Sequence, residues 1–406
     1  MKKLNSHLVK TTIALLAAGC SQTLLAANTD ENSLAEALAK GKVNADFRLR
    51  YENVEQDNAL KDANALTLRS RLGYTTATLS GFSAMLEMED VSVVAGVDDY
   101  SDVPTGFNPG EYSVIADPET TEVDQALLQY SNGGFTAKLG RQRIVYDNHR
   151  FIGDVGWRQD RQTYDGLSFN YKPSKELSLS YNYIGERRRI FAEDADVNSN
   201  DHLFNGSWKI SAGTLTGYAY LLEDEDKDST NDTYGVRFKG ASEAGDIKVL
   251  YTAEFASQAF EQGAADKDAD YYFLEGGAVV SGFTLKAGYE VLGSDGGTYG
   301  FATPLATLHG HNGWADQFLN TPAQGLVDSS LSIGGQLAGG NLKLIYHDFK
   351  ADKGTSGVND LGNEIDVVYS KTFAKGYSAG IKYASYSAGD VGVDTDKLWV
   401  WSGVKF

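Results

Sequence analysis

The chain has very little cysteine and proline. Cys20 is the only cysteine in 406 residues, and there are six prolines against 44 glycines. A single cysteine excludes an internal disulfide framework. Proline cannot donate a hydrogen bond to a strand ladder, and all six prolines fall between the strands predicted below, at Pro104, Pro109, Pro118, Pro173, Pro304 and Pro322.

Long apolar runs are also missing. Outside the N-terminus, no stretch of about 18 apolar residues is present, which excludes a transmembrane helix. A closed β-barrel is the other structure that pairs every backbone polar group within a bilayer. The formal net charge of −19 excludes a nucleic-acid partner.

Residues 1–27 are predicted to be a secretory signal peptide. Lys2, Lys3 and Lys10 form its basic region, residues 11–18 are apolar, and cleavage is expected after Ala26 or Ala27. A second interpretation stays open, because residues 17–20 (Ala-Ala-Gly-Cys) resemble a lipoprotein processing site that would lipidate Cys20. Residues 28–42 then form a short periplasmic segment, in which 33–41 carries the capping signals of a short helix, either a lid or a simple leader.

From residue 43 onward the apolar residues recur at every second position. Val43, Ala45, Phe47, Leu49 and Tyr51 alternate with polar residues, which is typical of a strand between lipid and water. Eighteen such segments are predicted, each near the length of about 9–11 residues that a tilted membrane strand needs: 43–53, 65–78, 82–90, 122–131, 135–144, 163–172, 177–186, 202–210, 214–222, 232–240, 246–256, 269–279, 283–292, 326–336, 341–349, 363–371, 377–386 and 397–406.

The connections between these segments alternate in length. Even-to-odd connections such as 79–81 and 280–282 are short, whereas odd-to-even ones are long, including 91–121, 145–162, 187–201, 257–268 and 293–325. Short periplasmic turns and long outer loops are typical of transmembrane barrels. The sequence therefore predicts an all-β fold, a transmembrane antiparallel β-barrel of about 18 strands over residues 43–406, in the outer membrane of a Gram-negative cell.

The chain ends on an aromatic residue, Phe406, with Val404, Val400 and Leu398 at alternating positions. This resembles the C-terminal signature by which the barrel-assembly machinery recognises its substrates. Lipid and lipopolysaccharide are the other partners that a barrel in the outer membrane implies.

Acidic and basic residues are expected at different places. The acidic residues concentrate in the outer loops, where they form a solvated rim or bind lipopolysaccharide phosphates through divalent cations; no metal is assigned. Examples are Asp98, Asp99, Asp117, Glu193, Asp196 and Asp266. Strand parity instead directs both basic and acidic side chains into the lumen, with the basic ones in small excess. They include Arg48, Arg50, Arg69, Arg71, Lys138, Arg237, Lys239, Glu87, Glu254 and Glu290. Rings of Arg and Lys favour anions, although charges of both signs would also serve to hold the wall of a wide barrel together.

Two segments resemble the alginate export family of outer-membrane porins. The first comprises 140–144 (Gly-Arg-Gln-Arg-Ile) with 156–166, and the second comprises 290–295, 303–309 and 312–318. The resemblance implies a monomeric barrel of eighteen strands with an arginine-rich constriction that passes an acidic polysaccharide. Arg141 and Arg143 share parity with lipid-facing residues, so they reach the lumen only if Gly140 begins a bulge. Arg158 and Arg161 are expected near the outer mouth.

The connection 293–325 is too long for a plain turn, and loops of this size are often functional. We expect it to fold inward and narrow the pore, with Trp314 and Phe318 as anchors and His309 and Asp316 in the constriction; a cap over the outer rim is the alternative. His309 and His311 are not assigned as metal ligands. The six histidines form no recognisable nucleophile–base motif, so no enzyme activity and no cofactor are predicted.

The predicted function is therefore a channel for anionic, alginate-like oligo- or polysaccharides through a lumen lined with basic residues. A general diffusion porin with weak selectivity is the alternative, and a sealed structural barrel is a third possibility. High conductance would exclude the sealed barrel.

Overall fold

The computed structural model describes residues 33–406 except 103–107, 356 and 374–375. The predicted signal peptide at 1–27, the lipidation alternative at Cys20, residues 28–32 and Pro104 lie outside the described residues. No described helix is long and apolar enough to cross a membrane.

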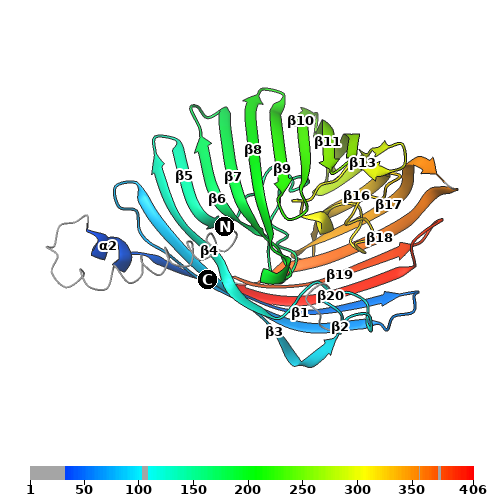
Figure 1. Ribbon diagram of the computed structural model, residues 1–406, viewed down its shortest axis with the longest axis horizontal. Coiled ribbons are helices and arrows are strands. Elements are labelled where there is room, and N and C mark those ends of the chain that lie inside the picture. Colours follow the sequence, from blue (N-terminus) through cyan, green and yellow to red (C-terminus); the bar gives the residue numbers. More distant parts are fainter. Residues whose placement is uncertain (1–32, 103–107, 356, 374–375) are drawn as a thin grey trace.

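Eighteen antiparallel strands form one closed sheet (Figure 1). Each strand pairs with its neighbours in the chain, and β1 also pairs with β20, where Gln56 lies opposite Thr395 and Asp46 opposite Lys405. This confirms the predicted barrel and its strand number. The strands are β1 (Lys42–Gln56), β2 (Ala63–Thr75), β3 (Phe82–Asp99), β4 (Thr120–Asn132), β5 (Phe135–Gln142), β6 (Thr163–Tyr171), β7 (Leu177–Arg188), β8 (Val197–Ile210), β9 (Gly213–Asp224), β10 (Ser229–Ala244), β11 (Ile247–Gln262), β12 (Ala265–Val280), β13 (Phe283–Leu292), β16 (Leu326–Leu337), β17 (Gly340–Thr355), β18 (Val358–Thr372), β19 (Tyr377–Ser387) and β20 (Thr395–Lys405).

Side chains along each strand alternate between the outside and the inside of the barrel, as expected. On β13, Leu285 and Tyr289 are 46% and 48% exposed on the outside of the barrel, whereas Glu290 is 7% exposed on the inside. Residues of one parity therefore meet lipid, and residues of the other parity line the lumen.

Short turns at one end of the barrel match the expected periplasmic side. The turns at Ser281–Gly282 and Ala338–Gly339 each place two consecutive residues at positive φ. This is the backbone requirement of the tight hairpin turns whose twist suits the flanking strands. Glycine supplies the second position in both turns because it adopts positive φ without a steric penalty.

The strands extend further at the outer end than predicted. Residues 257–268 were expected to be a loop, but β11 and β12 continue through them, with Ser257 paired to Asp270 and Gln262 to Ala265. These residues lie beyond the eleven-residue segments predicted for the membrane. Their outward side chains need not be apolar there, and the period-two signal disappears while the ladder continues.

The short helix α2 (Leu34–Ala39) begins at the predicted cap, where the Glu36 N–H donates to Ser33 Oγ at 3.2 Å. It lies beside the C-terminal end of β2, because Ala77 N–H donates to the Ala37 carbonyl and the Tyr74 hydroxyl donates to the Leu38 carbonyl. Three small elements complete the described chain: the 3-10 turns η1 (Glu193–Ala195) and η2 (Leu308–Gly310) and a two-stranded ribbon of β14 (Ser294–Asp295) and β15 (Tyr299–Gly300).

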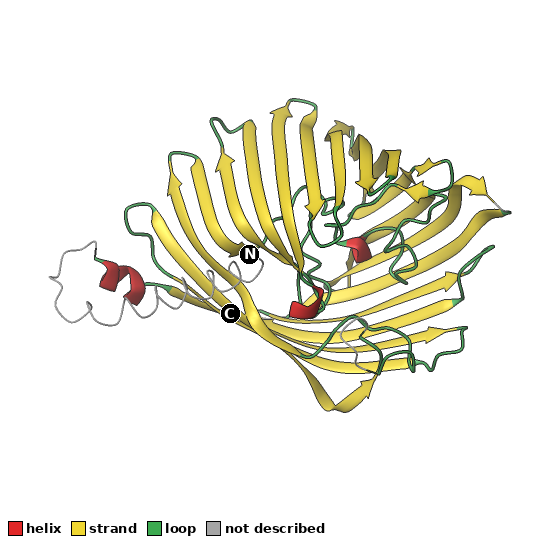
Figure 2. Cartoon of the chain, in the orientation of Figure 1, coloured by secondary structure: helices red, strands yellow, loops and turns green. Residues whose placement is uncertain are grey.

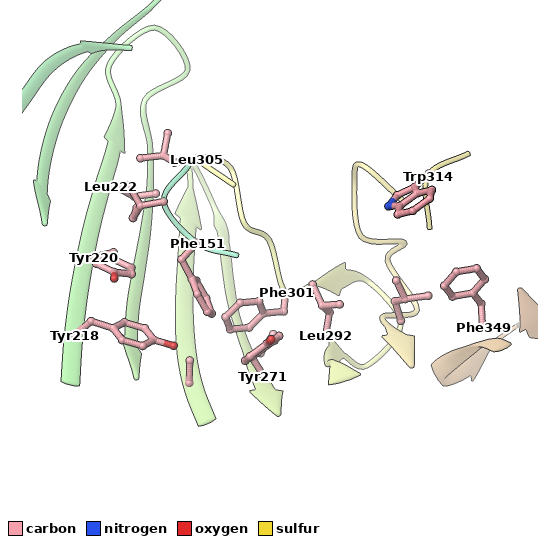
Figure 3. Packing of buried hydrophobic residues seen from close by; sticks show 14 of the residues in the cluster. Phe151, Tyr218, Tyr220, Leu222, Tyr271, Leu292, Phe301, Leu305, Trp314 and Phe349 are labelled. Atoms are coloured by element: carbon pink, nitrogen blue, oxygen red, sulfur yellow. The ribbon is translucent and has the colours of Figure 1, made fainter. Parts of the chain in front are cut away.

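Loop segments as well as strands occupy the interior of the barrel (Figure 2). An aromatic cluster in the interior joins the loop residues Phe151 and Phe301 to the wall residues Tyr218 and Tyr271 (Figure 3). The ring centroids of Phe151 lie 5.2 Å from Tyr218 and 5.3 Å from Tyr271. The lumen is therefore partly filled by packed aromatic side chains from two different loops.

Candidate channel constriction

Two loop segments fold into the lumen and touch each other. We call residues 143–162 the first lumen segment and residues 293–325 the second lumen segment. They meet in a short parallel bridge between Ile152 and Leu305, where the Gly153 N–H donates to the Leu305 carbonyl at 2.8 Å. The inward course of the second segment agrees with the sequence expectation. The first segment was expected to be an outer loop, because no periodicity in its residues indicates an inward course.

The first lumen segment is held by arginines of β1 and β2. Arg48 donates to the carbonyl oxygens of Trp157 at 2.8 Å and Arg158 at 2.5 Å, and to Gln159 Oε1 at 2.9 Å. Arg50 donates to the Trp157 carbonyl at 2.5 Å. These guanidinium groups satisfy backbone carbonyls that would otherwise be buried without a donor.

Arg48 differs from the other wall arginines in its charge balance. Arg50 pairs with Asp117, Arg69 with Asp46 at 2.7 Å, and Arg71 with Glu89. For Arg48, no carboxylate of a described residue lies within ion-pair distance, and the groups to which it donates are uncharged. Arg48 therefore keeps an uncompensated positive charge in the lumen. Asp117 was expected on the solvated outer rim, but it is 1% exposed because it reaches inward to Arg50.

Arg158 and Arg161 are both buried inside the barrel. Arg161 pairs with Glu87 on β3 and Asp124 on β4. Arg158 donates to both oxygens of Glu52 at 3.0 and 3.1 Å and to Asp316 of the second segment at 3.1 Å. Strand parity gives no direction to residues in an inward-folded loop, so it did not predict these ion pairs.

Asp316 receives three cationic or imidazole partners. It accepts from Arg158, from Lys397 on β20 at 2.9 Å and from His309 Nδ1 at 2.6 Å. Burial raises the pKa of Asp316, but His309, Lys397 and Arg158 outweigh burial and hold the pKa well below its usual range. Asp316 is therefore ionised and ties the second segment to both the wall and the first segment.

Lys382 of β19 enters a cage of aromatic rings. Its Nζ lies 3.8 Å from the ring centroid of Trp314, 4.2 Å from Trp157 and 5.2 Å from Trp399, and 2.6 Å from His309 Nε2. Burial lowers the pKa of His309 to about 3, despite Asp316. A neutral imidazole that donates from Nδ1 to Asp316 has Nε2 free to accept from the lysine. Trp314 thus lies in the constriction, as expected, while Phe318 packs on the wall with its ring centroid 4.6 Å from that of Phe349.

Strands β10, β11, β13 and β16 also hold both segments. Arg150 pairs with Glu290 at 2.8 Å, and Asn312 donates to Glu290 at 2.6 Å and to Asp328 at 3.1 Å. Arg237 pairs with Glu254 on the wall and donates to Asn148 at 3.3 Å. Glu254 and Glu290 are lumen-facing, in agreement with their parity.

Two cavities lie beside these segments. The first, which we call the arginine cavity, has a volume of about 310 Å³ and is bounded by β1, β2, β20 and the first lumen segment. Its charged lining has six basic and two acidic side chains: Arg48, Arg69, Arg71, Arg143, Arg161, Lys405, Asp46 and Asp154. The second cavity, about 560 Å³, lies under residues 310–312 and carries both signs, including Arg237, Lys239, Lys286, Lys343, Glu275 and Glu290.

Arg141, Arg143 and Lys138 take three different positions. Gly140 has a positive φ of 117°, but the register of β5 does not shift there, so Arg141 keeps the outward parity of Leu139 and pairs with Asp165 at 2.9 Å. Arg141 therefore does not line the lumen, which corrects the expectation. Arg143 reaches the arginine cavity because the chain leaves the sheet after Gln142 and turns inward. Lys138 is half-buried beside the β4–β5 turn.

No group of three or more His, Cys, Asp or Glu side chains that could hold a metal ion occurs in the part of the chain that the structure describes. The chemistry of the lumen is that of fixed charges, hydrogen-bond donors and aromatic rings. Such groups can select and hold a solute without any covalent step.

Comparison with known proteins agrees with this geometry. A sequence model described as alginate export matches residues 35–294, more than half of the chain. No curated protein matches the sequence. The fold is similar to that of OccAB4 of Acinetobacter baumannii (TM-score 0.69, 14% identity, 93% of this chain and 100% of that chain). It is also similar to OpdK of Pseudomonas aeruginosa solved with vanillate (TM-score 0.71, 11% identity, 91% and 99%) and to OccK9 of the same organism (TM-score 0.69, 14% identity, 91% and 100%).

Proposed function

The chain belongs to the alginate export family and is an outer-membrane β-barrel channel, and from this premise we propose that it passes anionic oligo- or polysaccharides through a basic-lined lumen. The observation that carries the proposal is the arginine cavity, where six basic side chains face two acidic ones. Basic linings favour anions in pores. The net charge of −19 does not oppose this, because selectivity depends on the charges at the narrow part of the path.

Arg48 is the residue that we expect to contribute most to anion preference. It has no carboxylate partner among the described residues, whereas Arg50, Arg69 and Arg71 are each paired. A paired guanidinium presents little net charge to a passing ion, but an unpaired one attracts anions over the screening distance of about 8–10 Å at physiological salt.

The proposal is tested with the purified barrel in a planar bilayer under a salt gradient. We expect a reversal potential that indicates anion preference and a current that uronate oligomers block at lower concentration than neutral oligosaccharides do. Arg48→Gln should weaken both effects. The matched control is Arg141→Gln, which removes an arginine that faces away from the lumen.

A general diffusion porin is the second candidate, and the mixed lining of the second cavity favours it. Weak selectivity that Arg48→Gln does not change, together with no block by uronates, would support this candidate and contradict the saccharide channel.

We further propose that residues 1–27 are removed as a signal peptide, that 28–42 remain as a short periplasmic segment, and that the barrel-assembly machinery recognises the C-terminal strand through Phe406. The barrel is expected to act as a monomer in lipid and lipopolysaccharide. The intact mass of the outer-membrane protein would identify the cleavage site and any lipid on Cys20. Deletion of Phe406 should reduce the amount of folded barrel in the outer membrane.

A further inference from the structure

Lys382 has an unusual environment for a charged side chain. It is 5% exposed, and no carboxylate of a described residue lies within ion-pair distance of its Nζ. Burial of an ammonium group is costly unless other groups compensate for the lost water. Here the compensation comes from three tryptophan faces and one imidazole nitrogen, since cations are attracted to aromatic faces within about 6 Å of the ring centroid.

The walls of this cage come from separate parts of the chain. Trp157 belongs to the first lumen segment, His309 and Trp314 belong to the second, and Trp399 belongs to β20. Trp157 and His309 also stack on each other, with centroids 5.0 Å apart and planes inclined by 5°. The cage is therefore complete only while both segments are docked against the β19–β20 wall.

We propose that Lys382 is a positioning residue that sets the width of the pore by clamping both lumen segments against this wall. The ammonium group favours the arrangement in which all three rings surround it, and that arrangement holds the two segments in the lumen. When the cage opens, both segments lose their contact with Lys382. The proposal rests on the channel function but does not depend on an anionic saccharide as the substrate.

The other contacts between the segments and the wall differ in kind. Arg158 and Lys397 reach Asp316 as ion pairs, which depend on distance and geometry between two partners. The cage instead needs the simultaneous presence of three rings around one cation. Lys343 on β17 provides a natural comparison, because its Nζ lies 5.9 Å from the Trp314 centroid but over no other aromatic ring of the described residues.

The test compares Lys382→Met, Lys382→Arg and Lys343→Met in single-channel recordings. Neutral polymers of increasing size are added to find the largest polymer that still enters the pore and lowers its conductance. Methionine keeps the length and apolar packing of lysine but removes the cation. Arginine keeps a cation that can lie over aromatic faces.

We expect Lys382→Met to admit larger polymers and to raise the ratio of open to closed time by about tenfold, as loss of a desolvated cation–π cluster implies. Lys382→Arg should restore most of the parental size limit. Lys343→Met removes the same charge from the lumen and should leave the size limit unchanged. An equal effect of Lys382→Met and Lys343→Met would overturn the proposal, because charge alone would then explain both.

A reversible crosslink gives an independent test. Ile152 and Leu305 pair across the two segments, and positions 33–406 contain no cysteine, so Ile152→Cys with Leu305→Cys introduces a single pair of thiols. In the Lys382→Met background, the oxidised pair should restore the parental size limit and its reduction should remove the restoration. If oxidation has no effect on the wider pore, the separation of the segments is not its cause, and the proposal is wrong.

A folding defect is separated from a positioning effect in two ways. The shift in gel mobility on heating reports whether the barrel is closed before each recording. If Lys382→Met does not fold, Trp314→Leu removes one wall of the cage from a loop that takes no part in the pairing of the eighteen barrel strands. This variant should also admit larger polymers than the parental pore does, and an unchanged size limit would contradict the proposal.

Discussion

Replacement of Arg158 by methionine is predicted to loosen both lumen segments without opening the barrel. Arg158 joins Glu52 of β1 to Asp316 of the second segment, and all three side chains are at most 6% exposed. Removal of one partner from a buried pair typically costs about 3–5 kcal/mol. Glu52 keeps Arg50 at 3.3 Å and Asp316 keeps Lys397 at 2.9 Å. We therefore expect the lower end, about 3 kcal/mol, which corresponds to about a hundredfold change in an opening equilibrium.

Hydrogen exchange measured by mass spectrometry in detergent micelles tests this magnitude. Amides of 154–161 and 306–316 should exchange about a hundredfold faster in Arg158→Met, since local opening controls their exchange, while amides in the strands should keep their protection. Arg141→Met is the matched control, because it breaks a pair with Asp165 on the outer face. Exchange that rises less than a few-fold, or that rises equally in the strands, would refute the assignment of Arg158 as the joint between wall and loops.

Two further predictions concern the effect of low pH on the docked segments and the effect of a substitution at Gly140. Burial lowers the pKa of His309 and of His311 to about 3. A histidine in an undocked segment binds a proton below about pH 6.5, whereas the docked histidines stay neutral down to about pH 3. The free energy of docking should therefore become less favourable as pH falls from 6.5 towards 3, by about 1 kcal/mol per histidine at pH 5.5. Exchange of 306–316, corrected for intrinsic rates, should rise between pH 7.5 and 5.5, and equal protection at both values would contradict the burial of neutral imidazoles. Gly140→Ala should lower the urea midpoint of the barrel. A Cβ at this position would lie 2.2 Å from the Ala126 carbonyl oxygen, at a backbone φ of 117°, and the resulting strain is about 1–3 kcal/mol. An unchanged midpoint would show that the strand relaxes at no cost.

The fold was largely predictable because membrane strands carry a strong local signal. Each strand must present lipid-compatible side chains at every second position, as Leu285 and Tyr289 do on β13. The signal ends at the membrane boundary, so the sequence predicts a loop at residues 257–268 although they continue β11 and β12.

The constriction was predictable only in part. Parity placed Arg48, Arg50, Arg69 and Arg71 in the lumen, since they belong to strands. It gave no direction for Arg158 and Arg161, whose positions depend on ion pairs with residues far away in the sequence. The contact of Lys382 with His309 likewise joins positions 73 residues apart, and no periodicity within either segment indicates it.

The antiparallel seam between β1 and β20 also limits how this lumen can change over evolutionary time. Every neighbouring pair around the ring is antiparallel, so the ring closes only with an even number of strands. Gain or loss of one strand would leave the first and last strands parallel, with both termini no longer on the same side of the membrane. Descendants of this gene can therefore widen or narrow the pore only by whole hairpins, each of which changes the circumference by about 10 Å at a strand spacing of about 4.8 Å. Finer adjustment of the aperture is left to the two loop segments within it.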